Sequence, residues 1–356
     1  MLNTIILFLF IFGIQFKNVP ISTSKIVVVV LAVWYLIFGL KKEGNHINIR
    51  ISKAYIYTFV VIIALLLISI FLPLILQTND FNVAYSVILL FAEDFIGAIL
   101  VYIFMSRNGK YTFDEFADDY IAICIIQSII ILVMLLSNPF KTSVWGILAT
   151  DYTDLNLRYG GIRGLGMASS VTYDLGVILS FAIMLQAYKM IKKNYTNIAI
   201  DITKIGTLCI GIALSGRTGI IGVAFAIILV GLDLVKNAKF TQIVKLLILI
   251  SALIAFIIFI YVECVPINLK VPLEAYLFEK TAQFSTANNI GGRHSFGKLL
   301  DMYFYIPFSV FFLGAGYYVD PITGLYYMNT DAGYMRQILF WGIIPSMLLY
   351  SLYLWV

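Results

Sequence analysis

Long apolar runs recur from one end of this 356-residue chain to the other, and they constrain its fold more than any other feature. Hydrophobic residues make up 61% of the chain and charged residues only 12%. An apolar run of about 18 residues or more is long enough for a helix to cross the hydrocarbon core of a bilayer. Alternating ten-residue segments are missing from the sequence, which argues against an outer-membrane β-barrel. The sequence therefore predicts an all-α polytopic membrane protein.

About ten transmembrane helices are expected, within a single integral membrane domain that covers residues 1–356. Their ranges are 2–16, 24–40, 54–76, 83–105, 117–136, 169–188, 198–215, 218–235, 243–262 and 334–356. The first run lacks a basic start and a small-residue cleavage site, so it is interpreted as a span and not as a removed signal peptide. The last run ends at Val356, so either the C-terminus lies at the inner face or the natural chain continues.

The distribution of lysine predicts the orientation of these spans. Lysines concentrate around 41–53, 110, 189–193 and 236–245, in loops that alternate with lysine-poor ones. Because basic residues accumulate on the cytoplasmic side, these loops and the N-terminus are predicted to be inside. The segments 137–168, 215–217 and 263–333 then face outward. The last of these is a large periplasmic or extracellular loop, for which we expect amphipathic helices at the membrane surface and a re-entrant apolar stretch at 304–316.

Arginine departs from the lysine trend. Five of the seven arginines lie in or beside the outward segments, and they are Arg158, Arg163, Arg217, Arg293 and Arg336. A guanidinium group binds phosphate or carboxylate through two parallel hydrogen bonds, which an ammonium group cannot do. Arg217 lies in a tight turn close to the hydrocarbon boundary, where a tolerated charge usually faces a polar cavity. The pattern predicts an outward anion-binding site, against the alternative of headgroup contacts and surface salt bridges.

Other polar residues are candidates for acid–base chemistry. His294 is the one outward histidine and could act as a base or an acid near neutral pH. Asp331 could bind substrate or cap the last helix, and Asp174 could balance an arginine or act as a base. Glu93 and Asp94 lie within the span 83–105, where they suit either a proton relay or a buried polar patch that joins helices.

Tyrosines gather in the segment before and at the start of the last span. They are Tyr303, Tyr305, Tyr317, Tyr318, Tyr326, Tyr327 and Tyr334. They suit an aromatic belt at the membrane interface, or stacking platforms for sugar rings, or both. Three scattered cysteines and two histidines give no metal-ligand spacing, so neither a metal nor another cofactor is expected. No basic run with interleaved aromatics is present, which excludes nucleic-acid binding.

Four stretches in this order resemble the O-antigen polymerase and ligase superfamily of bacterial envelope glycan assembly. They are Arg163–Gly166, Ser215–Gly219, Gly292-Arg293 followed by Phe304–Gly316, and Asp331–Tyr334 followed by Phe340–Ile344. The resemblance covers roughly residues 155–345 and implies the fold of the C-type membrane glycosyltransferases. It also implies a metal-independent, inverting transfer of a glycan from a polyprenyl diphosphate to a lipid-linked repeat unit. The ligase branch carries a His-Asn pair where this chain has Thr330-Asp331, so a polymerase is favoured over a ligase.

The resemblance also implies roles for individual residues. Arg217 and Arg293 match the family's diphosphate-binding arginines, and Arg163 is a third candidate. The catalytic base stays open among Asp331, His294 and Asp174. Secondary substrate-binding residues are expected at Arg158, Arg336 and Tyr334. The implied setting is the bacterial plasma membrane, with membrane lipid and a chain-length regulator as partners and O-antigen of lipopolysaccharide or capsule as the product.

A transporter or flippase of lipid-linked sugars is the alternative from another class. It would use Glu93 and Asp94, and it should show pseudo-symmetric halves with broken helices at the midplane.

Overall fold

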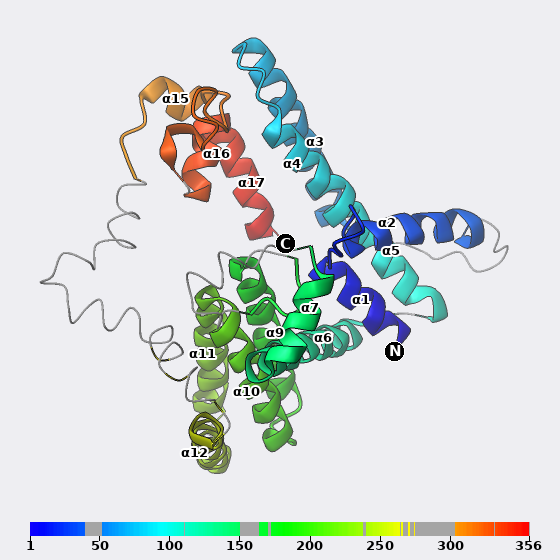
Figure 1. Cartoon of the computed structure of the whole chain (residues 1–356), viewed down its shortest axis with the longest axis vertical. Coiled ribbons are helices and arrows are strands. Elements are labelled where there is room, and N and C mark those ends of the chain that lie inside the picture. Colours follow the sequence, from blue (N-terminus) through cyan, green and yellow to red (C-terminus); the bar gives the residue numbers. More distant parts are fainter. Residues whose placement is uncertain are drawn as a thin grey trace, which may run out of the picture. The chain divides into compact units, whose positions relative to one another are not determined.

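A computed structural model describes residues 1–39, 52–109, 111–149, 164–169, 172–237, 240–263, 303–330 and 332–355, together with Val265, Lys270 and Glu274. Apart from two isolated β-bridges, the regular structure in these ranges is helical (Figure 1). Five of the described helices are long and apolar enough to cross a membrane, namely Lys53–Ile75, Asn82–Met105, Phe113–Leu136, Asp174–Lys192 and Ile198–Ser215. The prediction of a helical, multi-pass membrane protein is confirmed at this level. The number of spans beyond these five stays a prediction.

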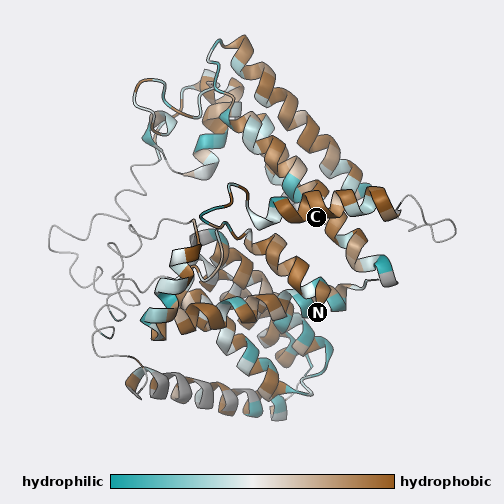
Figure 2. Ribbon diagram, turned by 45° about the vertical axis from the view of Figure 1, so that its right-hand side comes forward, coloured by the Kyte–Doolittle hydropathy of each residue, from teal (hydrophilic) through white to brown (hydrophobic). Residues whose placement is uncertain are grey.

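Apolar side chains cover the outer faces of these helices as well as their packed faces. Phe71, Val177 and Ile200 are each more than half exposed. Figure 2 shows hydrophobic residues along most of the length of the helices, with hydrophilic residues mainly at helix ends and in connections. Helices that are apolar all round are typical of a lipid environment, because lipid replaces water as the solvent of the exposed faces.

The chain divides into two compact units, of which unit 1 comprises residues 1–40 and 100–280. Its helices are α1 Leu2–Phe12, α2 Thr23–Trp34, the end of α5 Ile96–Met105, α6 Phe113–Leu136, α7 Asn138–Ile147, α9 Thr172–Lys192, α10 Ile198–Ser215, α11 Ile220–Lys236 and α12 Phe240–Glu263. The helix α9 packs against α6, α10 and α11. Its residues Leu175, Leu179 and Ala182 have no exposed surface. Residues of α9 thus form the centre of the unit 1 core.

Small residues allow the helices of unit 1 to approach one another closely. A Cβ atom at Gly222 of α11 would overlap Ser180 of α9, and one at Gly211 of α10 would overlap Ser128 of α6. Small residues are common where membrane helices pack, because lipid offers no hydrophobic drive and close van der Waals contact supplies the stabilisation.

One end of unit 1 carries a network of ion pairs and hydrogen bonds. The Lys192 ammonium lies 2.5 Å from the Asp114 carboxylate, and Lys189 pairs with Asp118. Asp119 accepts hydrogen bonds from the hydroxyls of Thr4 and Tyr111, each at 2.7 Å. The start of α1, the start of α6 and the end of α9 therefore lie together. These segments are all predicted to be cytoplasmic.

Unit 2 comprises residues 41–99 and 281–356. Its helices are α3 Lys53–Ile75, α4 Asn82–Leu89, the π-helical turn η2 Leu90–Phe95, α15 Phe308–Leu313, the 3₁₀ turn η5 Tyr327–Asn329, α16 Gly333–Trp341 and α17 Ile343–Trp355. The core of this unit surrounds Phe340 and Trp341. The indole N–H of Trp341 donates to the Ser69 hydroxyl on α3 at 2.9 Å, which satisfies the one polar atom of this buried ring.

The predicted final span 334–356 is not one continuous helix. It is divided at Gly342, which has a φ of 81°, into α16 and α17. The segment after α15 occupies the break, since the N–H groups of Ala315 and Gly316 donate to the carbonyls of Leu339 and Phe340 at 2.6 and 3.2 Å. These bonds satisfy carbonyl groups at the end of α16, which the interrupted helix leaves without intrahelical partners.

Candidate functional site

Two of the glycine-rich motifs singled out in the sequence lie side by side in unit 1. The N–H of Gly164 donates to the carbonyl of Leu214, at the end of α10, at 3.0 Å. Gln127 of α6 is completely buried, and its side chain donates to the Leu165 carbonyl at 2.6 Å and accepts from the Met167 N–H at 3.4 Å. The segment 164–169 is therefore held against α6 and against the turn that follows α10.

Gly166 fits this arrangement for a conformational reason. Its φ is +58°, and a Cβ atom there would lie 2.6 Å from the Gln127 amide nitrogen. Only glycine adopts this backbone at low cost and leaves room for the buried glutamine. The sequence pattern Gly164-Leu165-Gly166 is thus explained by the approach of this segment to α6.

The turn Ser215–Gly219 packs against the first turns of α9. It forms the 3₁₀ turn η4 Arg217–Gly219, and a Cβ atom at Gly176 would lie 2.5 Å from the Thr218 hydroxyl and 3.0 Å from the Gly216 carbonyl. The Ser180 hydroxyl lies 2.8 Å from the Gly176 carbonyl and 3.0 Å from that of Gly219, within hydrogen-bonding distance of both. The backbone of α9 at Gly176 is therefore in close contact with the backbone of the turn that carries Arg217, and this contact fixes the turn beside α9.

Asp174 belongs to the same end of unit 1. It lies in the first turn of α9, two residues before Gly176, and its side chain is exposed. The described residues thus bring together Gly164, the turn after α10 and Asp174. The Arg217 side chain, together with Arg158, Arg163, Arg293, His294 and Asp331, lies outside the described part of the structure.

Arg336 and Tyr334 lie on α16 in unit 2, where both contact aromatic rings. The guanidinium carbon of Arg336 lies 3.9 Å from the ring centroid of Tyr318 and 3.4 Å from that of Tyr326. Tyr334 packs on Tyr303 with ring centroids 5.5 Å apart. A guanidinium over two tyrosine faces is stabilised by cation–π attraction. Arg336 therefore joins the loop 318–326 to α16, a structural role that the sequence did not indicate.

Glu93 and Asp94 lie in the π-helical turn η2, within the span Asn82–Met105. Asp94 is exposed and Glu93 is half-buried. Short π-helical turns inside α-helices are frequent at functional sites. The two acids therefore lie in the π-helical part of a span that is otherwise α-helical.

Asp80 is a polar residue of unit 2 that the sequence interpretation missed. It is 9% exposed, and its carboxylate accepts hydrogen bonds from the backbone N–H groups of Tyr318 and Val319, at 2.7 and 2.8 Å. Its other oxygen accepts from the N–H and the side-chain amide of Asn82, at 3.1 and 2.9 Å. The sequence Thr78-Asn79-Asp80 indicates a turn, but nothing in it shows that the turn holds a segment so distant in the chain.

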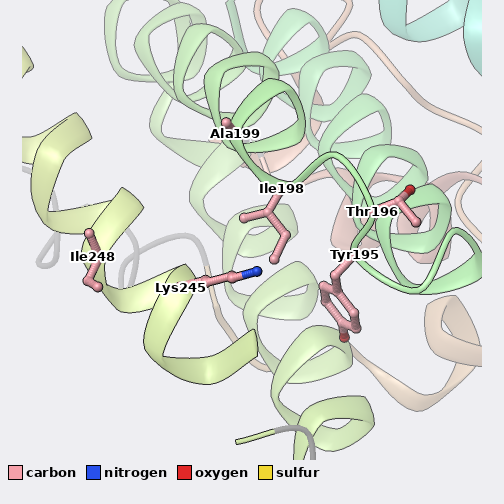
Figure 3. A pocket seen from close by; sticks show the side chains of 6 residues that line it. All are labelled: Tyr195, Thr196, Ile198, Ala199, Lys245 and Ile248. Atoms are coloured by element: carbon pink, nitrogen blue, oxygen red, sulfur yellow. The ribbon is translucent and has the colours of Figure 1, made fainter. Parts of the chain in front are cut away.

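A separate cavity of about 380 Å³ lies between the start of α10 and α12 in unit 1. Figure 3 shows the Lys245 ammonium directed toward Ile198 and Tyr195. The Tyr195 hydroxyl donates to Asp233 at 2.7 Å, and burial together with this bond raises the pKa of Tyr195. At 1.5 Å per residue, the length of α10 places this cavity roughly 27 Å from the turn at Ser215. It is therefore not part of the candidate site.

Comparisons of the chain with protein-family models, with curated proteins and with solved structures found no match. Within the described ranges, no group of three or more His, Cys, Asp or Glu residues could hold a metal ion. The function of the protein has to be inferred from its motifs and from the geometry of the two units.

Proposed function

We propose that the protein is a polymerase of surface polysaccharide repeat units. It transfers a glycan from a polyprenyl diphosphate to a lipid-linked repeat unit at the outer face of the bacterial plasma membrane. The observation that carries the proposal is the hydrogen bond from Gly164 to Leu214. It joins two of the arginine-bearing motifs on which the family resemblance depends, although they are far apart in the chain.

The chemistry of the donor explains why arginines are needed there. As the bond between the anomeric carbon and the diphosphate oxygen breaks, negative charge develops on the leaving diphosphate. Bidentate, charge-assisted hydrogen bonds from guanidinium groups stabilise that charge strongly in a site of low dielectric constant. Arg217 in the turn and Arg163, next to Gly164 in the sequence, are the proposed ligands in unit 1. The family resemblance adds Arg293 of the large loop as a further proposed ligand.

The reaction proceeds by inversion in this proposal. An acceptor hydroxyl oxygen forms a bond to the anomeric carbon, the bond to the diphosphate breaks, and the lipid diphosphate leaves. The hydroxyl proton passes to a carboxylate or imidazole base. Asp174 is the described candidate, because it lies two residues from the glycine that contacts the Arg217 turn. Asp331 and His294 remain the other candidates.

Deletion of the gene in its host, followed by electrophoresis of the surface glycan, tests the proposed function. Loss of a polymerase should leave surface molecules with a single repeat unit, because delivery of lipid-linked repeats continues. Reintroduction of the wild-type gene should restore long chains. Unchanged chain length in the deletion strain would contradict the proposal.

A flippase of lipid-linked sugars is a second candidate, favoured by the π-helical turn that carries Glu93 and Asp94. Acids in a distorted membrane helix suit coupled proton transport. Deletion of a flippase should leave no glycan at the surface at all. In a flippase, the pair of substitutions Glu93→Gln and Asp94→Asn should abolish surface glycan, whereas a polymerase should tolerate them.

A further inference from the structure

A groove of about 470 Å³, lined by both polar and apolar residues, lies in unit 2, in addition to the proposed arginine-bearing site of unit 1. One of its walls is the turn between α3 and α4, which contributes Thr78, Asn79 and Asn82. The other wall is the segment after α15, which contributes Tyr317. Both walls belong to the same compact unit. The sequence places both in loops on one side of the membrane, so their contact agrees with the predicted topology.

Hydrogen bonds hold the two walls of the groove in a fixed relation. The buried Asp80 carboxylate accepts from the N–H groups of Tyr318 and Val319. The Thr78 hydroxyl donates to the Gly316 carbonyl at 2.8 Å. The groove therefore has its shape before any ligand binds, which lowers the entropic cost of binding.

The backbone of the turn is strained where it borders the groove. Gln77 and Asn79 have φ values of +56° and +54°, in the left-handed region that residues other than glycine rarely adopt. Strain of this kind persists where the surrounding contacts enforce it, and it clusters at binding and active sites. The Asn79 side chain is exposed at the edge of the groove.

The chemical groups of the groove match an uncharged sugar. Tyr317 supplies an aromatic ring, which is supported by stacking on Tyr327 with centroids 5.4 Å apart and an interplanar angle of 25°. The amides of Asn79 and Asn82 can donate to and accept from sugar hydroxyls, and the Thr78 hydroxyl, which donates its proton to the Gly316 carbonyl, can accept from them. Among the described residues that line the groove there is no lysine, arginine or histidine, and Asp80 contributes a carboxylate. This described lining favours an uncharged ligand over a phosphate.

We propose that this groove is a binding subsite for neutral sugar rings, with Tyr317 as the stacking platform and Asn79 as a hydrogen-bonding residue. The subsite rests on the proposed function only in that its sugars belong to the glycan that is polymerised. The volume is within the range of small-molecule sites and accommodates a short saccharide.

Saturation-transfer NMR on the full chain in lipid nanodiscs tests the subsite. The probes are the methyl glycosides of glucose, galactose, mannose, rhamnose and N-acetylglucosamine. The variants are Tyr317→Ala, which removes the stacking ring, and Asn79→Gly, which removes the amide and keeps a residue suited to the left-handed backbone. Tyr85→Ala is the matched control, because Tyr85 is 61% exposed, belongs to the same unit and does not line the groove.

At least one glycoside should bind the wild-type protein. Its affinity should fall roughly tenfold in each groove variant, the loss expected for one stacking or hydrogen-bonding group, and it should be unchanged in Tyr85→Ala. Thermal unfolding of each variant checks that the protein is folded, and Asn79→Gly tests the proposal even if Tyr317→Ala unfolds. The absence of saturation transfer from every glycoside, or wild-type affinity in a folded groove variant, would overturn the subsite.

A polymerisation assay beside the binding experiment separates this proposal from the polymerase assignment. Arg217→Lys should leave glycoside binding intact, because a methyl glycoside has no diphosphate for Arg217 to bind. If Arg217→Lys abolishes polymerisation and the groove variants bind sugar normally, the subsite alone fails. If sugar binding maps to the groove and Arg217→Lys polymerises normally, the diphosphate site and not the subsite is contradicted.

Discussion

At the scale of single residues, Gly176 sets how closely α9 approaches the turn that carries Arg217. A Cβ atom at this position would lie 2.5 Å from the Thr218 hydroxyl and 3.0 Å from the Gly216 carbonyl. Gly176→Ala should therefore destabilise the protein by about 1–3 kcal/mol, the usual cost of overpacking. The matched control for this substitution is Gly231 on α11, since nothing lies within 4 Å of a Cβ atom there.

Gly231→Ala should leave the free energy of unfolding unchanged or raise it by up to about 1 kcal/mol. Thermal unfolding in detergent compares the two, and equal stabilities would contradict this account.

A second residue-scale prediction concerns pH. The N–H groups of Thr323 and Ile322 donate to the Asp320 carboxylate, at 2.8 and 2.9 Å, and these bonds lower its pKa from the ordinary value of 3.8. A lowered pKa in the folded state means that the ionised group stabilises the turn above pH 3.8, and that this stabilisation is lost as pH falls through the lower folded value. Amide exchange at Thr323, measured by mass spectrometry after correction for intrinsic rates, should thus lose protection in acid. Asp320→Asn should show weaker protection already at pH 7.

The contacts of individual side chains were the feature that the sequence predicted least well. It identified Arg336 as a candidate substrate ligand, and the structure places its guanidinium between Tyr318 and Tyr326. The stacking depends on how the loop 318–326 folds back on α16, and no local pattern encodes that path. The Gly164-Leu165-Gly166 pattern was more informative, because glycines in a loop indicate close backbone approach whichever partner is involved.

At the scale of elements, the break between α16 and α17 is the main difference from the prediction. A continuous apolar run predicted one span at 334–356. Gly342 ends α16, and Pro345 lies in the first turn of α17, where proline is tolerated. Glycine followed by proline was the available signal of a break. The contact that stabilises the break comes from residues Gly314–Gly316. These residues are distant from Gly342 in the sequence, so no local pattern predicts the contact.

Substitution at Gly342 tests this junction. Its φ is +81°, and a Cβ atom would overlap the Phe312 carbonyl oxygen. Gly342→Ala should cost about 2–4 kcal/mol, from left-handed strain and overlap together. Gly324→Ala separates the two causes, because Gly324 has a φ of +68° with nothing within 4 Å. It should cost only about 1 kcal/mol. Equal unfolding temperatures for the two variants would show that the packing at Gly342 is unimportant.

The short helix α7 is an element that the sequence interpretation did not include. Ser137 caps it through a hydrogen bond from the Phe140 N–H at 3.4 Å, and Pro139 lies in its first turn. These are ordinary start signals of a helix. Hydrophobicity alone marks the long spans, whereas a short helix within a predicted outward loop is indicated only by such local signals.

At the scale of the whole molecule, the arrangement of loops tests the predicted topology. The turn at Asn79 is predicted to face outward and the loop at Asn194 to face the cytoplasm, and both side chains are exposed. A membrane-impermeant maleimide should therefore label Asn79→Cys in intact cells and label Asn194→Cys only after permeabilisation. The parent chain gives the background labelling. The opposite labelling pattern would reverse the orientation of the protein, and with it the side of the proposed chemistry.

The helical class of the chain could be predicted from hydropathy, because length and apolarity suffice to identify a membrane helix. The grouping of helices into two compact units could not. Nor could the close contacts within unit 1, such as those of Gly222 with Ser180 and of Gly211 with Ser128, be predicted, because they join residues far apart in the chain. The candidate site lies between these extremes, since the motifs were visible in the sequence and the contact between Gly164 and Leu214 was not.

The most direct test of the central claim is polymerisation by the purified protein of the polyprenyl diphosphate-linked repeat units of its host. Wild-type protein should produce a ladder of long chains, with and without a metal chelator. Arg217→Lys should reduce the rate at least about 100-fold, because lysine cannot form the bidentate pair that stabilises the leaving diphosphate. Arg107→Lys is the matched control, since Arg107 donates to Asn3 and the Phe104 carbonyl, far from the motif at 215–219 in the chain. It should polymerise normally. A wild-type ladder from Arg217→Lys would contradict the claim, as would the absence of any ladder from the wild-type protein.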